Sequence, residues 1–310
     1  MPGEAPRAPG LRQDLIWRLE AVGFAGLTAL LRLMGVERAS DFGGWLLKTL
    51  GPRTGTHRTV LRNLRIAFPD MDPAARERLA LESWERTGRT FAETTQLDRI
   101  TMASGRLEVV GLERLEAIRD GDRPVVFVSG HLACFETMPA VILAAGIPCQ
   151  ITYRAANNPY VDAQIRRARA RYGVRLFAPK GGDGARELLG GLERGESVAL
   201  MNDQKFSDGP EVTFFGNPVN AAPGPSRLAL RFGTVLQPMS VVRLPGVRFR
   251  VTAHEPIALE RTGDRSVDIA RGVQAVTAFV EARVREVPED WFWVHKRWPD
   301  KVYAALPPEP

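Results

Sequence analysis

A histidine with a carboxylate five residues later follows an apolar segment in the middle of the chain. Residues 125–129 read Val-Val-Phe-Val-Ser, and Gly130, His131 and, five positions on, Glu136 come after them. A neutral imidazole can take a proton from a hydroxyl near neutral pH, and a carboxylate can orient the ring and stabilise the imidazolium. Residues five apart do not share a face of one helix, but the pair can meet if His131 lies in a strand-to-helix turn and Glu136 in the first helical turn. The pattern predicts a general base with an acidic partner.

The spacing alone is a weak signal, because short motifs also arise by chance. The 310 residues include four histidines and 36 acidic residues, and a second instance joins His295 to Asp300. That copy runs through Pro299, which directs the chain away from a helix. Only His131 follows an apolar strand and a glycine, so we take His131 and Glu136 as the catalytic pair. The alternative is a structural histidine in a turn.

Two polar residues follow the strand that we expect at 149–153. Asn158 precedes Pro159, which suits an N-cap and the first residue of a helix. Helix N-termini favour anions, so Arg154 is a candidate clamp for a phosphate or a developing oxyanion. An ion pair of Arg154 with Asp162 or Glu136 is an equally good interpretation.

Asp203 and Gln204 come directly after another predicted strand, 197–202. They are candidates for a second wall of the same cleft, although Asp203 could equally be a structural cap. A glycine-rich segment at 181–184 lacks the lysine and the spacing of a phosphate-binding loop, and a plain turn is the simpler interpretation.

From residue 124 onward, segments typical of strands alternate with segments typical of helices. This alternation predicts an α/β fold with a mostly parallel sheet covered by helices on both faces. Ligands bind such sheets at the carboxyl ends of the strands, where the candidate residues fall. The predicted strands are 124–129, 149–153, 174–178, 197–202, 234–243 and 248–256, and the predicted helices are 134–145, 159–172, 184–193, 223–232 and 266–286, with an earlier helix from Asp72-Pro73 to about Thr95.

The first 68 residues carry most of the net charge: ten Lys/Arg against five Asp/Glu, or +5 of the chain's +6. Apolar residues at 15–34 recur mainly at spacings of three or four, and the uncharged run 21–31 is 11 residues long. Spanning a bilayer takes ~20. A basic amphipathic helix predicts a segment lying in the interface of an anionic membrane surface; packing against the protein's own core is the alternative. We therefore divide the chain into a membrane-associating region, 1–68, and an α/β domain, 69–310.

Two cysteines, Cys134 and Cys149, give no disulfide framework, and no Cys/His cluster has zinc spacing. A reducing environment fits, no metal or cofactor is expected, and the N-terminus lacks the pattern of a signal peptide.

Five ordered blocks of the sequence carry a family resemblance. The chain resembles the late acyltransferases of lipid A biosynthesis, the lauroyl/myristoyl transferases, a branch of the glycerol-phosphate/lysophospholipid acyltransferase superfamily. The resemblance covers roughly residues 15–300. Its blocks are Gly130-His131-X4-Glu136, Tyr153-Arg154-X2-Asn157-Asn158-Pro159-Tyr160-X-Asp162, Asp203-Gln204, Thr213-Phe214-Phe215-Gly216 and Trp293-Val294-His295-Lys296-Arg297-Trp298.

The resemblance implies transfer of a fatty acyl chain from acyl carrier protein, or acyl-CoA, to a hydroxyl of a lipid or glycolipid acceptor. It also implies a peripheral or monotopic position on the cytoplasmic side of the inner membrane, with no cofactor and no nucleic acid partner. His131 and Glu136 carry over as the catalytic dyad, and Arg154, Asp203 and Gln204 as cleft residues. We group Asn158 with these as substrate-binding.

The chain departs from that family in two ways. Its N-terminal apolar segment is shorter than the usual membrane helix, and Lys205 stands where many relatives carry a further acid. A different glycolipid or a lysolipid acceptor would fit the second departure.

No serine or cysteine lies in an activated context, so direct attack by the acceptor hydroxyl is expected rather than an acyl-enzyme. Alternatives that stay open are a lysophospholipid O-acyltransferase, a hydrolase using the same dyad and a non-catalytic membrane-binding protein.

Overall fold

The computed structural model describes residues 10–153, 155–174, 177–179 and 182–307. Its centre is a seven-stranded sheet in the order β1-β9-β8-β2-β5-β3-β4. Neighbouring strands run parallel except β8 and β9, which form an antiparallel pair. The strands are β1 (Leu107–Val110), β2 (Val126–Ser129), β3 (Cys149–Tyr153), β4 (Phe177–Pro179), β5 (Ser197–Met201), β8 (Leu236–Leu244) and β9 (Arg248–Ala253). The predicted α/β fold with a mostly parallel sheet is confirmed.

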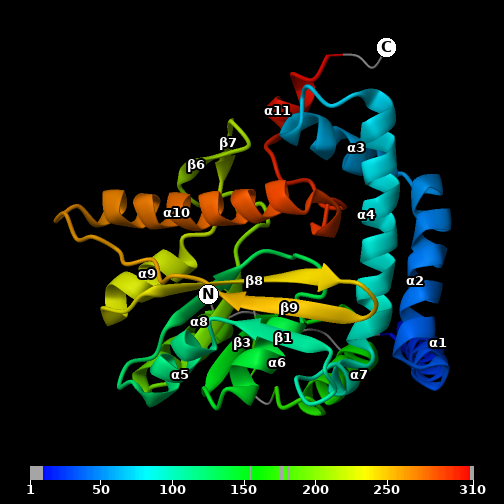
Figure 1. The fold of residues 1–310 in the computed structure, drawn as a ribbon, viewed down its shortest axis with the longest axis horizontal. Coiled ribbons are helices and arrows are strands. Elements are labelled where there is room, and N and C mark those ends of the chain that lie inside the picture. Colours follow the sequence, from blue (N-terminus) through cyan, green and yellow to red (C-terminus); the bar gives the residue numbers. More distant parts are fainter. Residues whose placement is uncertain (1–9, 154, 175–176, 180–181, 308–310) are drawn as a thin grey trace.

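Helices cover both faces of this sheet (Figure 1), so its central strands are apolar on both sides. All four residues of β2 are buried. Phe127 packs in the larger core cluster with α6, whereas Val126 and Val128 pack with residues of α8, α9 and α10. These helices are α5 (Leu112–Asp120), α6 (Thr137–Ala144), α7 (Pro159–Ala170), α8 (Gly182–Glu193), α9 (Gly224–Phe232), α10 (Arg265–Glu286) and the short α11 (Asp300–Ala304).

Four helices precede the sheet: α1 (Leu11–Met34), α2 (Val36–Leu50), α3 (Thr56–Ala67) and α4 (Pro73–Thr94). The helices α2 and α4 run side by side at the right of Figure 1 and touch through glycines. A Cβ atom on Gly43 would lie 2.4 Å from the Gly88 carbonyl oxygen, and one on Gly88 would lie 2.0 Å from that of Gly43. The two backbones can approach this closely because neither residue has a side chain.

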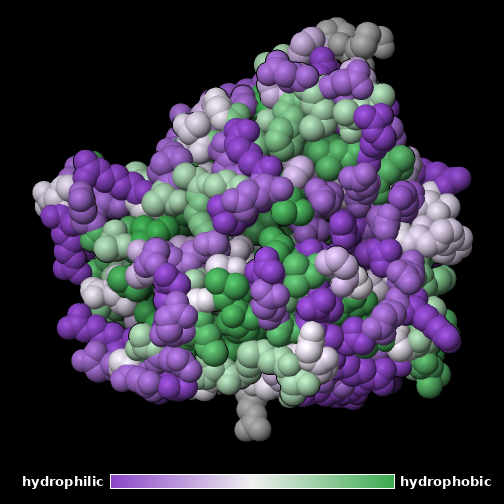
Figure 2. Space-filling view, viewed as in Figure 1, coloured by the Kyte–Doolittle hydropathy of each residue, from purple (hydrophilic) through white to green (hydrophobic). Residues whose placement is uncertain are grey.

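Helix α1 carries large apolar side chains on a solvent-exposed surface. Its exposed large residues include Leu11, Leu15, Leu19, Val22 and Leu33, whose exposed fractions run from 59 to 93%. Hydrophobic side chains are visible at the edge of Figure 2 where α1 lies. In the part of the chain that the structure describes, no helix is long and apolar enough to cross a membrane.

The predicted elements agree with the structure to within a few residues. The Asp72 carboxylate caps α4 by accepting a hydrogen bond from Ala75 N, and Asn158 caps α7 in the same way from Tyr160 N and Val161 N. The sequence prediction missed β1 with its following helix α5, and a small antiparallel hairpin of β6 (Glu211–Phe214) and β7 (Asn217–Asn220). Short 3-10 segments lie at Gly51–Arg53, Leu97–Arg99 and Pro288–Asp290.

Candidate active site

The turn after β2 presents His131 at the carboxyl end of the sheet. Gly130 leaves room for Asp203 there: a Cβ on Gly130 would lie 3.2 Å from Asp203 Oδ2 and 3.0 Å from a methyl of Val280, so these side chains would have to shift slightly. The backbone N–H of His131 donates to Asp203 Oδ2 at 2.7 Å. The predicted strand–glycine–histidine turn is therefore present, and a distant aspartate fixes it.

Asp203 also orients the imidazole. His131 Nδ1 lies 2.7 Å from Asp203 Oδ1, and Trp291 Nε1 donates to Asp203 Oδ2 at 2.8 Å. The Asp203 side chain is 3% exposed. Burial by itself raises the pKa of this carboxyl, but His131 and the indole of Trp291 outweigh burial and hold its pKa well below the usual range. An ionised Asp203 favours the tautomer with a proton on Nδ1, which places the ring's lone pair on Nε2.

Glu136 has other partners. Arg169 binds its carboxylate with Nε and a terminal nitrogen, and the Tyr172 hydroxyl donates to Oε2 at 2.8 Å. Both Glu136 and Arg169 are largely buried, with side chains 12 and 17% exposed. The sequence interpretation gave Glu136 the task of orienting His131, whereas Asp203 accepts the hydrogen bond from Nδ1. A catalytic role for Glu136 stays a prediction.

The turn depends on α4 and on the segment after α10. Ala133 adopts a left-handed conformation with φ of 42°, which costs a non-glycine residue about 1–2 kcal/mol. Its N–H donates to the carbonyl of Asp290 at 2.8 Å, and its carbonyl accepts from the Thr90 hydroxyl at 3.1 Å. These two hydrogen bonds hold the backbone directly between His131 and Glu136.

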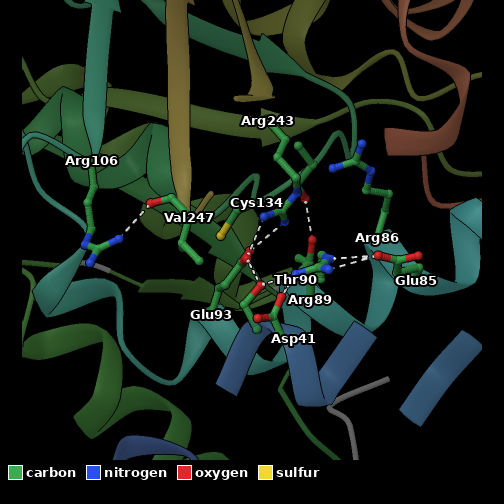
Figure 3. A network of polar contacts seen from close by, with 12 residues as sticks. Asp41, Glu85, Arg86, Arg89, Thr90, Glu93, Arg106, Cys134, Arg243 and Val247 are labelled. Atoms are coloured by element: carbon green, nitrogen blue, oxygen red, sulfur yellow. Dashed lines mark hydrogen bonds and ion pairs between the residues drawn. The ribbon is translucent and has the colours of Figure 1, made fainter. Parts of the chain in front are cut away.

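A buried ion pair lies beside this turn (Figure 3). Arg243 of β8 and Glu93 of α4 point toward each other next to Cys134 and form two hydrogen bonds of 2.6 and 2.7 Å. Their side chains are 3 and 0% exposed, and the Ser40 hydroxyl donates to the same carboxylate. The pair connects β8 of the sheet to α4, beside the turn after β2.

A cavity of about 600 Å³ opens over His131. We call it the His131 cavity. Its apolar floor comes from strands and α6, including Phe127, Met138, Ile142, Ile151 and Leu200. Its other lining residues include polar and charged ones: His131, Glu136, Asp162, Arg169, Gln204, Lys205, His295 and Lys296.

Of the other predicted site residues, two lie at the His131 cavity and one lies elsewhere. Gln204 lines the His131 cavity, and Asp203 supports His131 from beneath it. Asn158 uses its side chain elsewhere, capping α7 and donating to the Trp17 carbonyl and the Glu20 carboxylate of α1. Its substrate-binding role stays a prediction, and Arg154 lies outside the described residues.

His295 also lines the His131 cavity, although its spacing to Asp300 was set aside as accidental. The rings of His131 and His295 lie on Phe292, at centroid distances of 6.4 and 6.0 Å. Partial burial and the neighbouring His131 lower the pKa of His295, so its ring is neutral near pH 7. Sequence alone could have pointed to it only through the family block that contains it.

A second, larger cavity adjoins the first. We call this space of about 1390 Å³ the apolar chamber; it lies among α1, α2, α4 and α7 and is lined mainly by apolar side chains such as Val22, Leu27, Leu31, Phe42 and Phe91. Four residues line both cavities and therefore lie between them: Phe135, Glu136, Ile165 and Arg169.

The described residues contain no group of three or more His, Cys, Asp or Glu side chains placed to hold a metal ion. The two cysteines are buried, and burial raises the pKa of both thiols, which disfavours the reactive thiolate. The cysteines are therefore poorly suited to act as nucleophiles, whereas His131 and His295 both line the cavity.

The chain is similar to proteins of one known family. Residues 11–300 match the model of a family described as bacterial lipid A biosynthesis acyltransferase. The chain belongs to this family. It is therefore an acyltransferase.

Family relatives are distant in sequence. The lipid A biosynthesis palmitoleoyltransferase of Escherichia coli is 24% identical over 76% of each chain, and the lauroyltransferase of the same organism is 24% identical over 78% of each. The Escherichia coli myristoyltransferase is 27% identical over 62% of this chain and 58% of that relative. A solved structure of the 1-acyl-sn-glycerophosphate (LPA) acyltransferase PlsC from Thermotoga maritima covers 76% of this chain and 97% of that chain, with a TM-score of 0.37 and 14% identity.

Proposed function

We propose that the protein transfers a fatty acyl chain from a carrier-protein or coenzyme A thioester to a hydroxyl of a lipid A precursor or a related glycolipid. The observation that carries the proposal is the hydrogen bond between His131 Nδ1 and Asp203 at the wall of a cavity, in a member of an acyltransferase family. The bond favours the tautomer that a general base needs.

In the proposed reaction, Nε2 of His131 takes the proton of the acceptor hydroxyl as the oxygen attacks the thioester carbonyl. The tetrahedral intermediate collapses by breaking the C–S bond, and the imidazolium returns the proton to the leaving thiolate. Asp203 holds the ring and stabilises the imidazolium, as the orienting acid does in other histidine-based sites. Backbone N–H groups of the turn after β2 are the candidate donors to the oxyanion.

In this proposal, Glu136 acts by holding α7 and the turn after β2 in place. Its carboxylate ties α7 to the catalytic turn through Arg169 and Tyr172. Because Glu136 and Arg169 line both cavities, this pair shapes the passage between His131 and the apolar chamber.

The apolar chamber is suited to the hydrocarbon of a lipid substrate. Helix α1 supplies more of its lining residues than any other helix, and the exposed leucines of α1 make it a candidate for the membrane interface. We propose that α1 lies in the lipid interface on the cytoplasmic side of the inner membrane and that the chamber receives acyl chains from it.

The proposal is tested with purified protein, lipid A precursors in detergent micelles and acyl donors of both kinds, with mass spectrometry of the products. We expect one added acyl chain with the wild type and none with His131→Ala, which should unfold at the same denaturant concentration. Release of free fatty acid with no acylated lipid would instead indicate a hydrolase. Acylation of lysophospholipid in preference to lipid A precursors would identify a lysolipid acyltransferase.

A further inference from the structure

Two lysines from separate segments meet at the His131 cavity. Lys205 lies two residues after Asp203, and Lys296 lies five residues after Trp291. Because Trp291 donates to Asp203, the carboxylate that orients His131 also brings these two segments together. Both lysine side chains line the cavity.

The acidic side chains of this cavity are already neutralised. Glu136 binds Arg169, and Asp162 binds Arg166 at 2.6 Å and accepts from Ala156 N at 2.9 Å. His131 is held by Asp203. Among the described lining residues, these pairs leave Lys205 and Lys296 as the charges that no buried acid compensates.

The partners of the lysines are weak. Lys296 Nζ lies 3.9 Å from Asp300 Oδ1, with side chains 57 and 82% exposed, and 5.7 Å from the centroid of the Tyr303 ring. Exposed contacts of these kinds contribute about 1 kcal/mol or less. Lys205 is exposed and forms no ion pair with a carboxylate of the described chain. Both ammonium groups can therefore turn to an anion that enters the cavity.

We propose that Lys205 and Lys296 form a basic rim of the His131 cavity that binds a phosphate group carried by one of the two substrates. The inference rests on the proposed function and names a specificity determinant of that site. A lysine binds phosphate as a flexible point charge, which suits a group held at the cavity mouth while the reacting hydroxyl or thioester reaches His131. The phosphate belongs either to the acceptor's headgroup or to the phosphopantetheine arm of the donor.

The test compares Lys205→Gln, Lys296→Gln and the double variant with Lys301→Gln. The control removes the same charge from α11, where Lys301 is 67% exposed and lies outside the His131 cavity. Each protein is assayed with an acceptor that carries or lacks its phosphate, and with acyl-CoA or the acyl thioester of N-acetylcysteamine, which has no phosphate.

We expect the double variant to raise KM about tenfold for the substrate whose phosphate is bound, as for loss of charge-assisted hydrogen bonds, with kcat changed less than twofold. Removing that phosphate should raise KM in the wild type and abolish the difference between wild type and variant. If the KM difference disappears when the acceptor lacks its phosphate, the basic rim binds the acceptor. If it disappears when the donor lacks its phosphate, the rim binds the donor.

Equal KM values with and without either phosphate would overturn the basic rim while leaving the proposed function intact. A loss of kcat with all substrate pairs would also overturn it, because that result indicates a structural role. If the wild type transfers no acyl group, the proposed function fails, and quenching of tryptophan fluorescence by inorganic pyrophosphate then tests the rim directly. Binding that the double variant retains in full would refute it.

Discussion

The His131 cavity and the apolar chamber share a wall but are built differently. The first is bounded by carboxyl ends of strands and by side chains with fixed hydrogen bonds, among them the partly buried bond between Asp203 and His131. The second is bounded by four helices, and one of these, α1, is mostly exposed. Groups that transfer protons must be held within narrow limits, whereas hydrocarbon binds without directional contacts. The difference fits the proposed roles, in which the first cavity holds the reacting groups and the second holds hydrocarbon.

The largest effect should come from the carboxylate that orients the histidine. We expect Asp203→Asn to lower kcat by about 10²-fold or more, because an amide cannot stabilise the imidazolium. Glu136→Gln keeps a hydrogen-bond acceptor for Arg169 and Tyr172 and should lower kcat much less. Steady-state kinetics with both variants measures the contrast. An equal or larger loss in Glu136→Gln would return the orienting role to Glu136, as the sequence interpretation had it.

The ion pair behind the His131 cavity should affect stability. Arg243→Met leaves Glu93 buried without its cation, and we expect a loss of about 3–5 kcal/mol in the free energy of unfolding. The double variant Arg243→Met/Glu93→Met should recover most of this loss, since it removes both buried charges. Urea denaturation followed by circular dichroism measures both. Equal destabilisation by the single and double variants would show that packing, and not charge, dominates there.

Filling the apolar chamber should change substrate range without touching proton transfer. Ala168 lines the chamber on α7, and Ala170 two residues later is exposed and does not line it. We expect Ala168→Trp to lower kcat/KM for the longest acyl chains about tenfold, within the range of pocket-based discrimination, and to spare short chains. Ala170→Trp is the matched control. A uniform loss for all chain lengths would mean that the chamber does not hold substrate hydrocarbon.

The smallest effect should come from the exposed face of α1. Replacing Leu15, Leu19 and Leu33 by glutamine should weaken sedimentation with anionic liposomes several-fold, since each exchange removes part of the apolar surface that inserts into lipid. Added salt should weaken the remaining binding further. Val267→Gln on α10, another exposed apolar position, serves as control. Unchanged sedimentation of the triple variant would place the membrane contact on another surface.

Local patterns predicted most of the fold, because strand–helix alternation and the caps at Asp72 and Asn158 act within a few residues. The missed hairpin of β6 and β7 has four-residue strands, and Pro218 interrupts the second one. Neither segment therefore shows a recognisable strand pattern in the sequence. Half of the site could be predicted in the same local way: His131 and its turn. Its partner is 72 residues away in sequence, and only the fold decides that Asp203, rather than the nearer Glu136, reaches the ring.

The proposed division of the chain at residue 68 follows charge, which is a property of composition. Contacts follow another rule: α2, which precedes residue 68, has its most extensive packing on α4, which follows it. Composition describes what a segment can bind in solvent or lipid, and it carries little information about which neighbour covers its other face.

The glycine contact between α2 and α4 has a mechanical consequence. Because Gly43 and Gly88 bring the two backbones together without intervening side chains, α2 cannot slide along α4 without a collision. The same α4 carries Thr90 to the Ala133 carbonyl and Glu93 to Arg243. With α1 in the lipid interface, as proposed, these contacts would hold His131 at a set height above the bilayer surface.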